Sequence, residues 1–151
     1  MKKKILFALC ILLTVSAATV FAAPSVNGST GLINNPTADV LREGQFSLGY
    51  YHLQEGGSGS FNFNLAKNLE VGVTGFRYDD SKTNRTFFNA KWGMLPETVV
   101  TPGLAIGVED IANETERTFY VAASKALPLG FRIHAGIGNG RYDGLFAAVE
   151  K

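Results

Sequence analysis

Cysteine is almost absent from this chain of 151 residues. The single cysteine, Cys10, lies within a leader that has three lysines at positions 2–4, an apolar run from Ile5 to Val15, and small residues up to Ala22. This order is typical of a secretory signal peptide, and the apolar run is too short for a retained membrane helix. We predict cleavage after Ala22. The exported chain then has no cysteine, which excludes disulfides and thiolate metal sites and leaves the fold to hydrogen bonding and burial.

Charged residues are few and nearly balanced. Without residues 1–22 the chain keeps 11 basic residues against 13 acidic ones, a net charge of −2. That balance provides no electrostatic basis for binding nucleic acid. No run of 18 apolar residues follows the leader, which excludes membrane-spanning helices but not membrane-spanning strands. The remaining 129 or so residues suit one domain.

Residues that support catalysis or metal binding are also scarce. Histidine occurs only at His52 and His134, and the sequence has no Glu-x-x-His motif or paired acids at ligand spacing. We therefore predict no metal and no cofactor. Ser47 or Ser124 would need a base to act as a nucleophile, and the sequence reveals no partner for His134. The interpretation is that the protein is not an enzyme; an envelope hydrolase would require an acid, a base and a nucleophile brought together by the fold.

Alternating apolar and polar residues dominate what is present. Between Phe61 and Tyr78, Phe61, Phe63 and Leu65 share one face before Lys67-Asn68, and Leu69, Val71 and Val73 share one face after it. A period of two indicates strands, so this stretch predicts a β-hairpin with a tight Lys-Asn turn. Six further segments with the pattern extend the prediction to eight strands, at residues 45–53, 60–66, 69–78, 86–95, 102–110, 117–126, 131–139 and 144–150.

The second face of these strands is small and charged. Glycine, alanine and serine alternate there with isolated charges, which suits a crowded interior. Folding the last hairpin about Arg141 sets Arg132 opposite Glu150. We predict an interior charged cluster with a stabilising rather than a catalytic role, made of Glu70, Lys91, Glu109, Arg132, His134 and Glu150.

Residues 23–44 differ in character from the strands. Asn35 is a plausible helix N-cap, Pro36 suits the first helical position, and Gly44 can follow a helix that ends at Arg42. We predict a short helix in this segment, which precedes the strand domain at residues 45–151. Because longer polar connections alternate with short turns, we expect the two ends of the sheet to lie in different compartments, with the N-terminal segment on the periplasmic side.

Two all-β interpretations fit this pattern. In an outer-membrane barrel, an antiparallel up-and-down barrel of about eight strands, the apolar face meets lipid and the polar face fills the interior. In a soluble periplasmic barrel the apolar face turns inward and can bind a small apolar ligand. We favour the membrane barrel, with a structural or accessory role in the envelope, because of the small residues on the polar face and the aromatic residues near strand ends. Six such aromatics are expected to form interfacial girdles: Tyr50, Tyr51, Tyr78, Trp92, Tyr120 and Tyr142.

Both ends of the exported chain match a known pattern. Residues 28–38 read Gly-Ser-Thr-Gly-Leu-Ile-Asn-Asn-Pro-Thr-Ala, followed by Leu41, Gly44-Gln45-Phe46 and Leu48-Gly49-Tyr50; residues 140–146 read Gly-Arg-Tyr-Asp-Gly-Leu-Phe. This resembles the YjbH-like outer-membrane proteins associated with exopolysaccharide, although Ala147-Ala148 stands where that family tends to carry a second glycine pair. Members are far longer, and this chain resembles their N-terminal module. The resemblance implies an outer-membrane β-barrel with a part in polysaccharide production or export.

The last predicted strand is short and does not end in an aromatic residue. Unpaired strand edges are costly in lipid. We therefore expect either an imperfect closure between residues 45–53 and 144–150 or a larger barrel completed by additional strands. The partners implied are outer-membrane lipid, the barrel-assembly machinery, and polysaccharide or export components.

Overall fold

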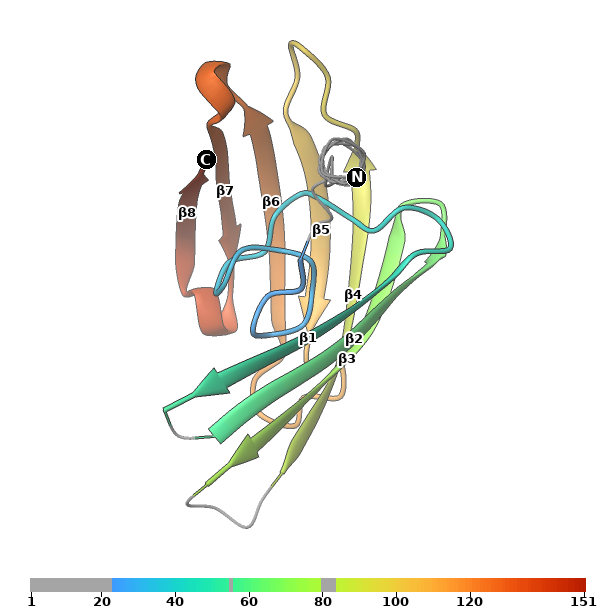
Figure 1. Ribbon diagram of the computed structural model, residues 1–151, viewed down its shortest axis with the longest axis vertical. Coiled ribbons are helices and arrows are strands. Elements are labelled where there is room, and N and C mark those ends of the chain that lie inside the picture. The colour runs from blue at the N-terminus through green and yellow to red at the C-terminus, as the bar shows by residue number, and fades with distance from the viewer. Residues whose placement is uncertain (1–22, 55, 80–83) are drawn as a thin grey trace, which may run out of the picture.

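The protein is one curved antiparallel sheet of eight strands. The computed structural model describes residues 23–54, 56–79 and 84–151, so the predicted signal peptide, residues 1–22, lies outside the described residues. Each strand pairs with the next along the chain (Figure 1). The strands are β1 (Phe46–Leu53), β2 (Gly56–Ala66), β3 (Leu69–Tyr78), β4 (Arg85–Leu95), β5 (Gly103–Glu109), β6 (Thr118–Ala126), β7 (Arg132–Gly138) and β8 (Gly144–Glu150).

The eight predicted strands are therefore confirmed, and so is the tight turn at Lys67-Asn68. Asn68 adopts a φ of 60°, which suits the short polar side chain of asparagine. The start of β2 was predicted too late, because residues 56–59 were assigned to a loop. Gly56 in fact pairs with both Leu53 and Tyr78. A Cβ at Gly56 would lie 1.9 Å from the carbonyl oxygen of Arg77, so this position needs a residue without a side chain.

The closed eight-stranded barrel is not observed. Within the ranges given above, the sheet order runs from β1 to β8 with no ladder between these two strands, so the sheet is open and has two edges (Figure 1). β7 and β8 are only seven residues long, while β2 and β4 have eleven. We inferred a closed barrel from the number of strands. Closure also requires that the two edge strands, β1 and β8, match in length and in register.

The predicted helix at residues 35–42 is wrong. In the part of the chain that the structure describes, the helical elements are two short 3-10 turns, η1 (Pro128–Gly130) and η2 (Gly140–Tyr142). Residues 23–44 form turns and isolated bridges instead, because sheet side chains accept their backbone N–H groups. The amides of Thr30 and Leu41 donate to Glu70, and the amide of Ala38 donates to Ser124. No helix among residues 23–54, 56–79 and 84–151 is long and apolar enough to cross a bilayer.

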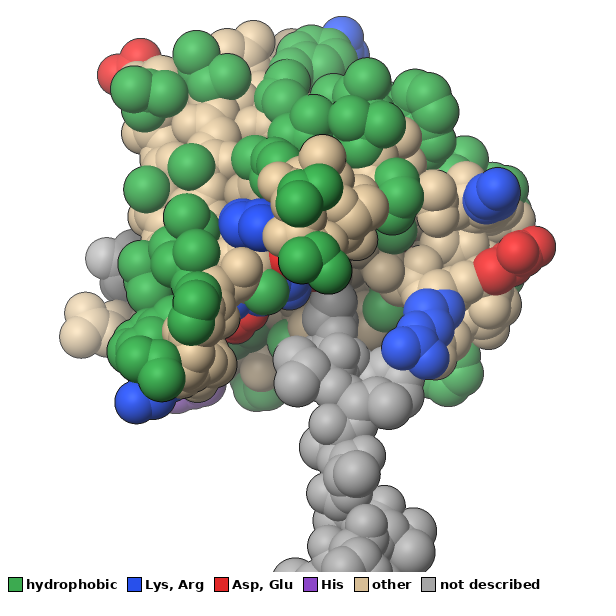
Figure 2. Space-filling view, turned by 90° about the horizontal axis from the view of Figure 1, so that it is seen from above, with side chains coloured by type: hydrophobic (Ala, Val, Ile, Leu, Met, Phe, Trp, Pro, Cys, Tyr) green, Lys and Arg blue, Asp and Glu red, His purple; other side chains and the backbone are tan. Residues whose placement is uncertain are grey.

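Burial on the two faces of the sheet is inverted relative to a water-soluble protein. The inner face, which contacts residues 23–44, buries Glu70 and Lys91 to 1% exposure each. The outer face leaves Leu48 and Leu145 exposed at 71% and 86%. Figure 2 shows hydrophobic side chains over much of the surface seen from above. The alternative with an inward apolar face is therefore wrong: alternation identifies two faces, and only tertiary contacts decide which one is covered.

The expected aromatic girdle is wrong for most of its members. Tyr50 and Trp92 are exposed on the outer face. Four of the six expected members lie on the inner side instead: Tyr51 donates to the carbonyl of Pro24, Tyr78 stacks on the buried Phe76, Tyr120 is 3% exposed, and Tyr142 donates to Glu109. Tyr120 lies over Gly107 of the neighbouring strand, where a Cβ would be 2.3 Å from its ring, so this aromatic fills the space above a glycine.

Candidate functional site

Residues 23–41, which we call the inner segment, lie within the curve of the sheet (Figure 1). They form hydrogen bonds with all eight strands. The strand residues involved, in order from β1 to β8, are Tyr51, Ser58, Thr74, Asn89, Glu109, Ser124, Arg132 and Ala147. The candidate functional site is therefore the polar inner face together with the inner segment that fills it.

Thr30 is held from both sides of its backbone. Its N–H donates to the Glu70 carboxylate at 2.8 Å, and its hydroxyl donates to the same group. The Lys91 ammonium donates to the Thr30 carbonyl at 2.5 Å. Glu70 also accepts the N–H of Leu41 at 3.1 Å. Glu70 and Lys91 are cross-strand neighbours on β3 and β4, so two adjacent charges of opposite sign anchor the inner segment.

Gly28 marks the closest approach of the inner segment to the sheet. Its φ is +102°, and an added Cβ would lie 1.8 Å from Thr74 Oγ1 and 2.6 Å from Asn89 Nδ2. The Gly28 carbonyl accepts from Asn62 Nδ2 at 2.5 Å. Both the backbone conformation and the contact distance therefore require glycine here.

Glu109 anchors the inner segment next to Thr30, through Ser29. Its carboxylate accepts from the hydroxyls of Ser29 at 3.1 Å and Tyr142 at 3.0 Å, and Arg141 Nη2 lies 3.5 Å from it. Burial raises the pKa of the Tyr142 hydroxyl, and the neighbouring Glu109 raises it further, so Tyr142 stays protonated and donates.

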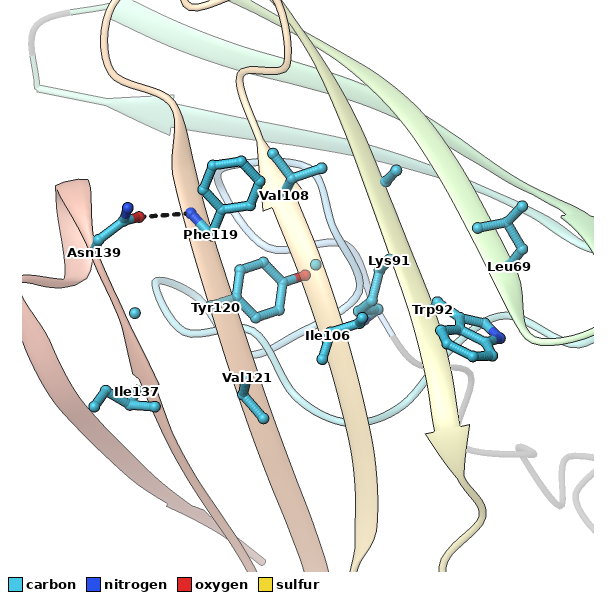
Figure 3. A pocket seen from close by; sticks show the side chains of 13 residues that line it. Leu69, Lys91, Trp92, Ile106, Val108, Phe119, Tyr120, Val121, Ile137 and Asn139 are labelled. Atoms are coloured by element: carbon cyan, nitrogen blue, oxygen red, sulfur yellow. Dashed lines mark hydrogen bonds between the residues drawn. The ribbon is translucent and has the colours of Figure 1, made fainter.

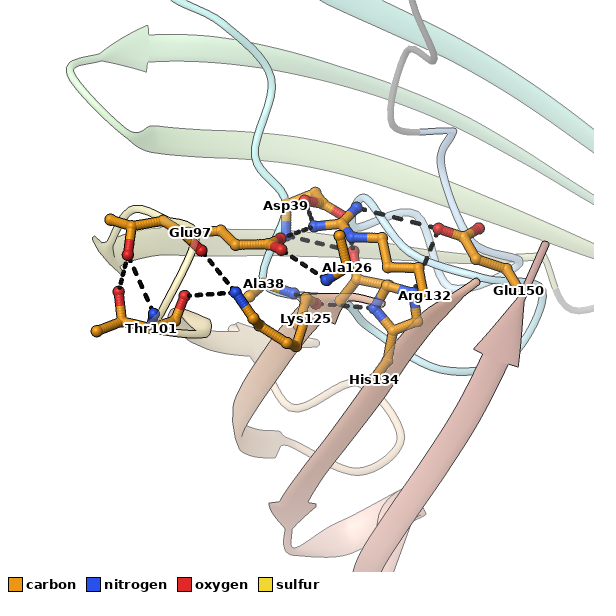
Figure 4. A network of polar contacts seen from close by, with 12 residues as sticks. Ala38, Asp39, Glu97, Thr101, Lys125, Ala126, Arg132, His134 and Glu150 are labelled. Atoms are coloured by element: carbon orange, nitrogen blue, oxygen red, sulfur yellow. Dashed lines mark hydrogen bonds and ion pairs between the residues drawn. The ribbon is translucent and has the colours of Figure 1, made fainter. Parts of the chain in front are cut away.

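A second charged group surrounds Arg132 (Figure 4). The guanidinium contacts both oxygens of Asp39 at 2.6 Å and Glu97 at 2.8 Å, and it lies 4.0 Å from Glu150. Burial by itself would raise the pKa of Asp39 and Glu97. For Asp39 the hydrogen bonds and charge of Arg132 outweigh burial; for Glu97 the N–H of Ala126 and then Arg132 do so. The pKa of each carboxyl is therefore lowered, and both stay ionised.

His134 links two residues that sequence reasoning did not connect. Its Nδ1 lies 2.8 Å from Ser124 Oγ and its Nε2 lies 3.3 Å from Glu150 Oε1 (Figure 4). A serine, a histidine and a carboxylate in a chain are the components of a hydrolase triad. Here, however, Ser124 is 1% exposed and its oxygen accepts the N–H of Ala38 at 2.8 Å. The inner segment thus covers the hydroxyl, and the chain of contacts serves to hold Ala38.

The six residues predicted as an interior charged cluster all lie on the inner face, in two groups. Glu70, Lys91 and Glu109 contact Ser29 and Thr30. Arg132, His134 and Glu150 lie on β7 and β8, where Arg132 binds Asp39 of the inner segment. Arg132 is opposite Glu150, which is the register expected for the last hairpin. Among the described residues, no three His, Cys, Asp or Glu side chains are grouped to hold a metal ion.

Sequence reasoning missed the inner segment as the partner of this face. It also missed Asp39 and Glu97 as the carboxylates of Arg132. A usable signal was present: Ser25, Asn27, Ser29 and Thr30 form a run of small polar residues that suits contact with a polar face. Because that run contains no charged residue, its partners on the sheet could not be identified by matching opposite charges.

The outer face also carries a hollow, of about 600 Å³. Leu69 and Trp92 lie on one side of it, Val121 and Ile137 on the other, and Ile106 between them (Figure 3). Asn139 at its rim accepts the N–H of Phe119 at 2.7 Å. The hollow is a depression in the apolar surface and contains no arrangement of polar groups for recognising a specific ligand.

A protein-family model matches most of the chain. The model of the YjbH family, described as "Exopolysaccharide biosynthesis protein YbjH", matches residues 24–149. This match includes strands β1 to β7, β8 except its last residue, and the inner segment except its first residue. Neither the curated proteins nor the solved structures contain a match to this chain. Because the family match covers most of the sequence, the chain belongs to the YjbH family of exopolysaccharide biosynthesis proteins.

Proposed function

We propose that this chain forms a β-barrel wall in the outer membrane and has a structural or accessory role in exopolysaccharide production or export. The observation that carries the proposal is the inverted burial. Charged residues such as Glu70 are buried by the inner segment, whereas Phe46, Leu48 and Leu145 are 64% to 86% exposed. Soluble proteins rarely expose such a continuous apolar surface, while membrane barrels require one that faces lipid.

A membrane wall built from this sheet needs a partner strand at each of its two edges. β1 and β8 each have one side without a partner strand in the described chain. Unpaired backbone groups cost several kcal/mol each in lipid. In the membrane these edges are therefore paired, either with each other after a change in curvature or with strands outside this sheet. The barrel-assembly machinery is the proposed partner for that step, and lipid is the partner of the outer face.

The filled interior supports a structural or accessory role over a permanently open pore. The inner segment hydrogen-bonds to every strand, so the concave face is occupied in this conformation. The covered hydroxyl of Ser124 gives no support to hydrolysis. The connection with exopolysaccharide rests on family membership, and the proposed polar partners are the polysaccharide itself or its export components.

Cell fractionation tests this proposal. The protein is expressed with its N-terminal leader, and envelopes are washed with carbonate and urea before extraction with detergent. We expect the protein in the detergent extract of the outer membrane. Recovery in the soluble periplasm without detergent would overturn the membrane role. Electrophoresis of unheated samples adds a second readout: a compact, heat-sensitive monomer band would indicate that β1 and β8 close on each other, and a band that needs a second chain would indicate pairing outside this sheet.

A further inference from the structure

One end of the inner face carries a pocket that the anchoring of the inner segment does not explain. It has a volume of about 240 Å³ and lies where β3 and β5 end and β4 begins. Phe76, Tyr78 and Phe87 form its aromatic wall, and Asp110, Glu116 and Arg141 supply its charged groups. The volume lies below the roughly 300–1,000 Å³ of pockets for drug-sized ligands, so it suits a single ring.

The aromatic wall is rigid. Phe76 and Phe87 are 9% and 6% exposed, and their ring centroids are 5.3 Å apart. Tyr78 stacks on Phe76 at 6.4 Å with an interplanar angle of 17° and is 36% exposed. The apolar wall therefore ends in an accessible ring with a hydroxyl. A ring face is electronegative and attracts the polarised C–H groups of a pyranose.

The charged groups are positioned by the fold. The Asp110 carboxylate accepts the N–H groups of Glu114, Thr115 and Glu116 at 2.7 to 3.0 Å. Burial alone would raise the pKa of Asp110, but these backbone hydrogen bonds outweigh it and lower the pKa, so the group stays ionised. Arg141 lies 3.5 Å from Glu109 and is 35% exposed, which leaves guanidinium N–H groups for a further acceptor.

We propose that this pocket binds one neutral pyranose unit of a polysaccharide. The Glu116 carboxylate and the Arg141 guanidinium beside an aromatic wall match the hydroxyl groups and the C–H face of a sugar. Asp110, which is 1% exposed and accepts three backbone N–H groups, holds the loop that carries Glu116. Two carboxylates line the pocket, and its one guanidinium already contacts Glu109, so an anionic uronate is disfavoured. The inference rests on the proposed role in polysaccharide handling and identifies the substrate class as neutral glycan.

The test uses detergent-solubilised full-length protein and three neutral hexasaccharides, from cellulose, amylose and β-1,3-glucan, with hexagalacturonate as the acidic comparison. Binding is measured by calorimetry, and the contacting protons by saturation-transfer difference NMR. We expect ring C–H signals from at least one neutral oligosaccharide and weaker binding of hexagalacturonate. Tyr78→Ala and Glu116→Gln should each weaken binding about tenfold. The matched controls Tyr50→Ala, on the outer face, and Glu114→Gln, outside the pocket lining, should not.

Absence of binding by all three neutral probes would overturn the inference, as would equal losses in the pocket variants and their controls. Preferential binding of hexagalacturonate would overturn the neutral class. These results are separable from the proposed function. Membrane-located protein that binds no glycan contradicts only the pocket, whereas soluble protein that binds glycan through Tyr78 contradicts only the membrane role.

Discussion

Glu70→Gln is expected to release the inner segment without unfolding the sheet. The carboxylate accepts the N–H of Thr30 through one oxygen and the N–H of Leu41 through the other. A glutamine side chain has a single acceptor oxygen, so one of these two amides faces an NH₂ group instead. The buried Lys91 ammonium also loses its cross-strand counter-charge.

The magnitude follows from the kind of interaction lost. Removing one partner of a buried charge pair costs about 3–5 kcal/mol. Glu70 is the carboxylate that interacts most strongly with the Lys91 charge, ahead of Asp39 and Glu109. Since each 1.4 kcal/mol is a tenfold change in equilibrium, the inner segment should open about 10² to 10³ times more often. This estimate concerns local opening, because the strand ladders on either side of Glu70 do not depend on its side chain.

Hydrogen exchange followed by mass spectrometry measures this opening. Peptides covering residues 24–41 should lose protection in Glu70→Gln, while peptides from β6 keep theirs. Glu43→Gln, an exposed change just beyond the inner segment, is the matched control. The double variant Glu70→Gln, Lys91→Met should recover part of the protection because no buried charge is left alone. The reasoning is refuted if Glu70→Gln changes exchange no more than Glu43→Gln.

Three further expectations use the same preparation. Gly28→Ala should displace the inner segment, at a cost of about 3 kcal/mol, because the new methyl group meets Thr74. The control Gly44→Ala has a similar positive φ but no atom within 4 Å of the new methyl group. Equal losses of protection in the two variants would show that backbone strain, and not the contact with Thr74, causes the effect. The lowered pKa of Asp110 stabilises the 110–117 loop at pH values above the ordinary aspartate pKa of about 4, and this stability is lost as the pH falls through the lower pKa of the folded state. Hydrogen exchange of the loop, corrected for the intrinsic rate, should therefore depend on pH in the parent protein and not in Asp110→Asn. A pH dependence that persists in Asp110→Asn would contradict the role given to Asp110. Ile133→Arg on the outer face should lower the stability of the folded band by about 2–4 kcal/mol in lipid; equal tolerance of Ile133→Arg and the loop variant Glu114→Arg would argue against lipid contact.

The strands could be predicted because their signal is local. Alternation depends only on the two-residue period of a strand, and residues 61–78 show it on both sides of the turn. The faces were also separable, since Glu70, Lys91 and Arg132 each alternate with the apolar residues of their own strand. The start of β2 was missed because glycine and serine carry no periodic signal, and pairing with β1 and β3 determines their conformation.

The role of residues 23–44 could not be predicted in the same way. Asn35, Pro36 and Gly44 satisfy local rules for a helix, but Glu70, Ser124 and Lys91 compete for the same backbone groups from strands 29 to 86 residues away in sequence. A buried carboxylate that accepts two amides outweighs a helical propensity of a few tenths of a kcal/mol per residue. Local propensity therefore failed where long-range polar contacts decide the conformation.

The sequence by itself determined eight antiparallel strands with one apolar and one charged face, because period-two alternation is a property of neighbouring residues. Its leader composition predicts export. The tertiary structure decided the rest. It decided that the inner segment of the same chain covers the charged face. One group of charged side chains surrounds Thr30 and a second group surrounds Arg132. The free edges of β1 and β8 are not paired with each other. These outcomes depend on sheet curvature and on contacts between residues far apart in the chain, for which alternation carries no information.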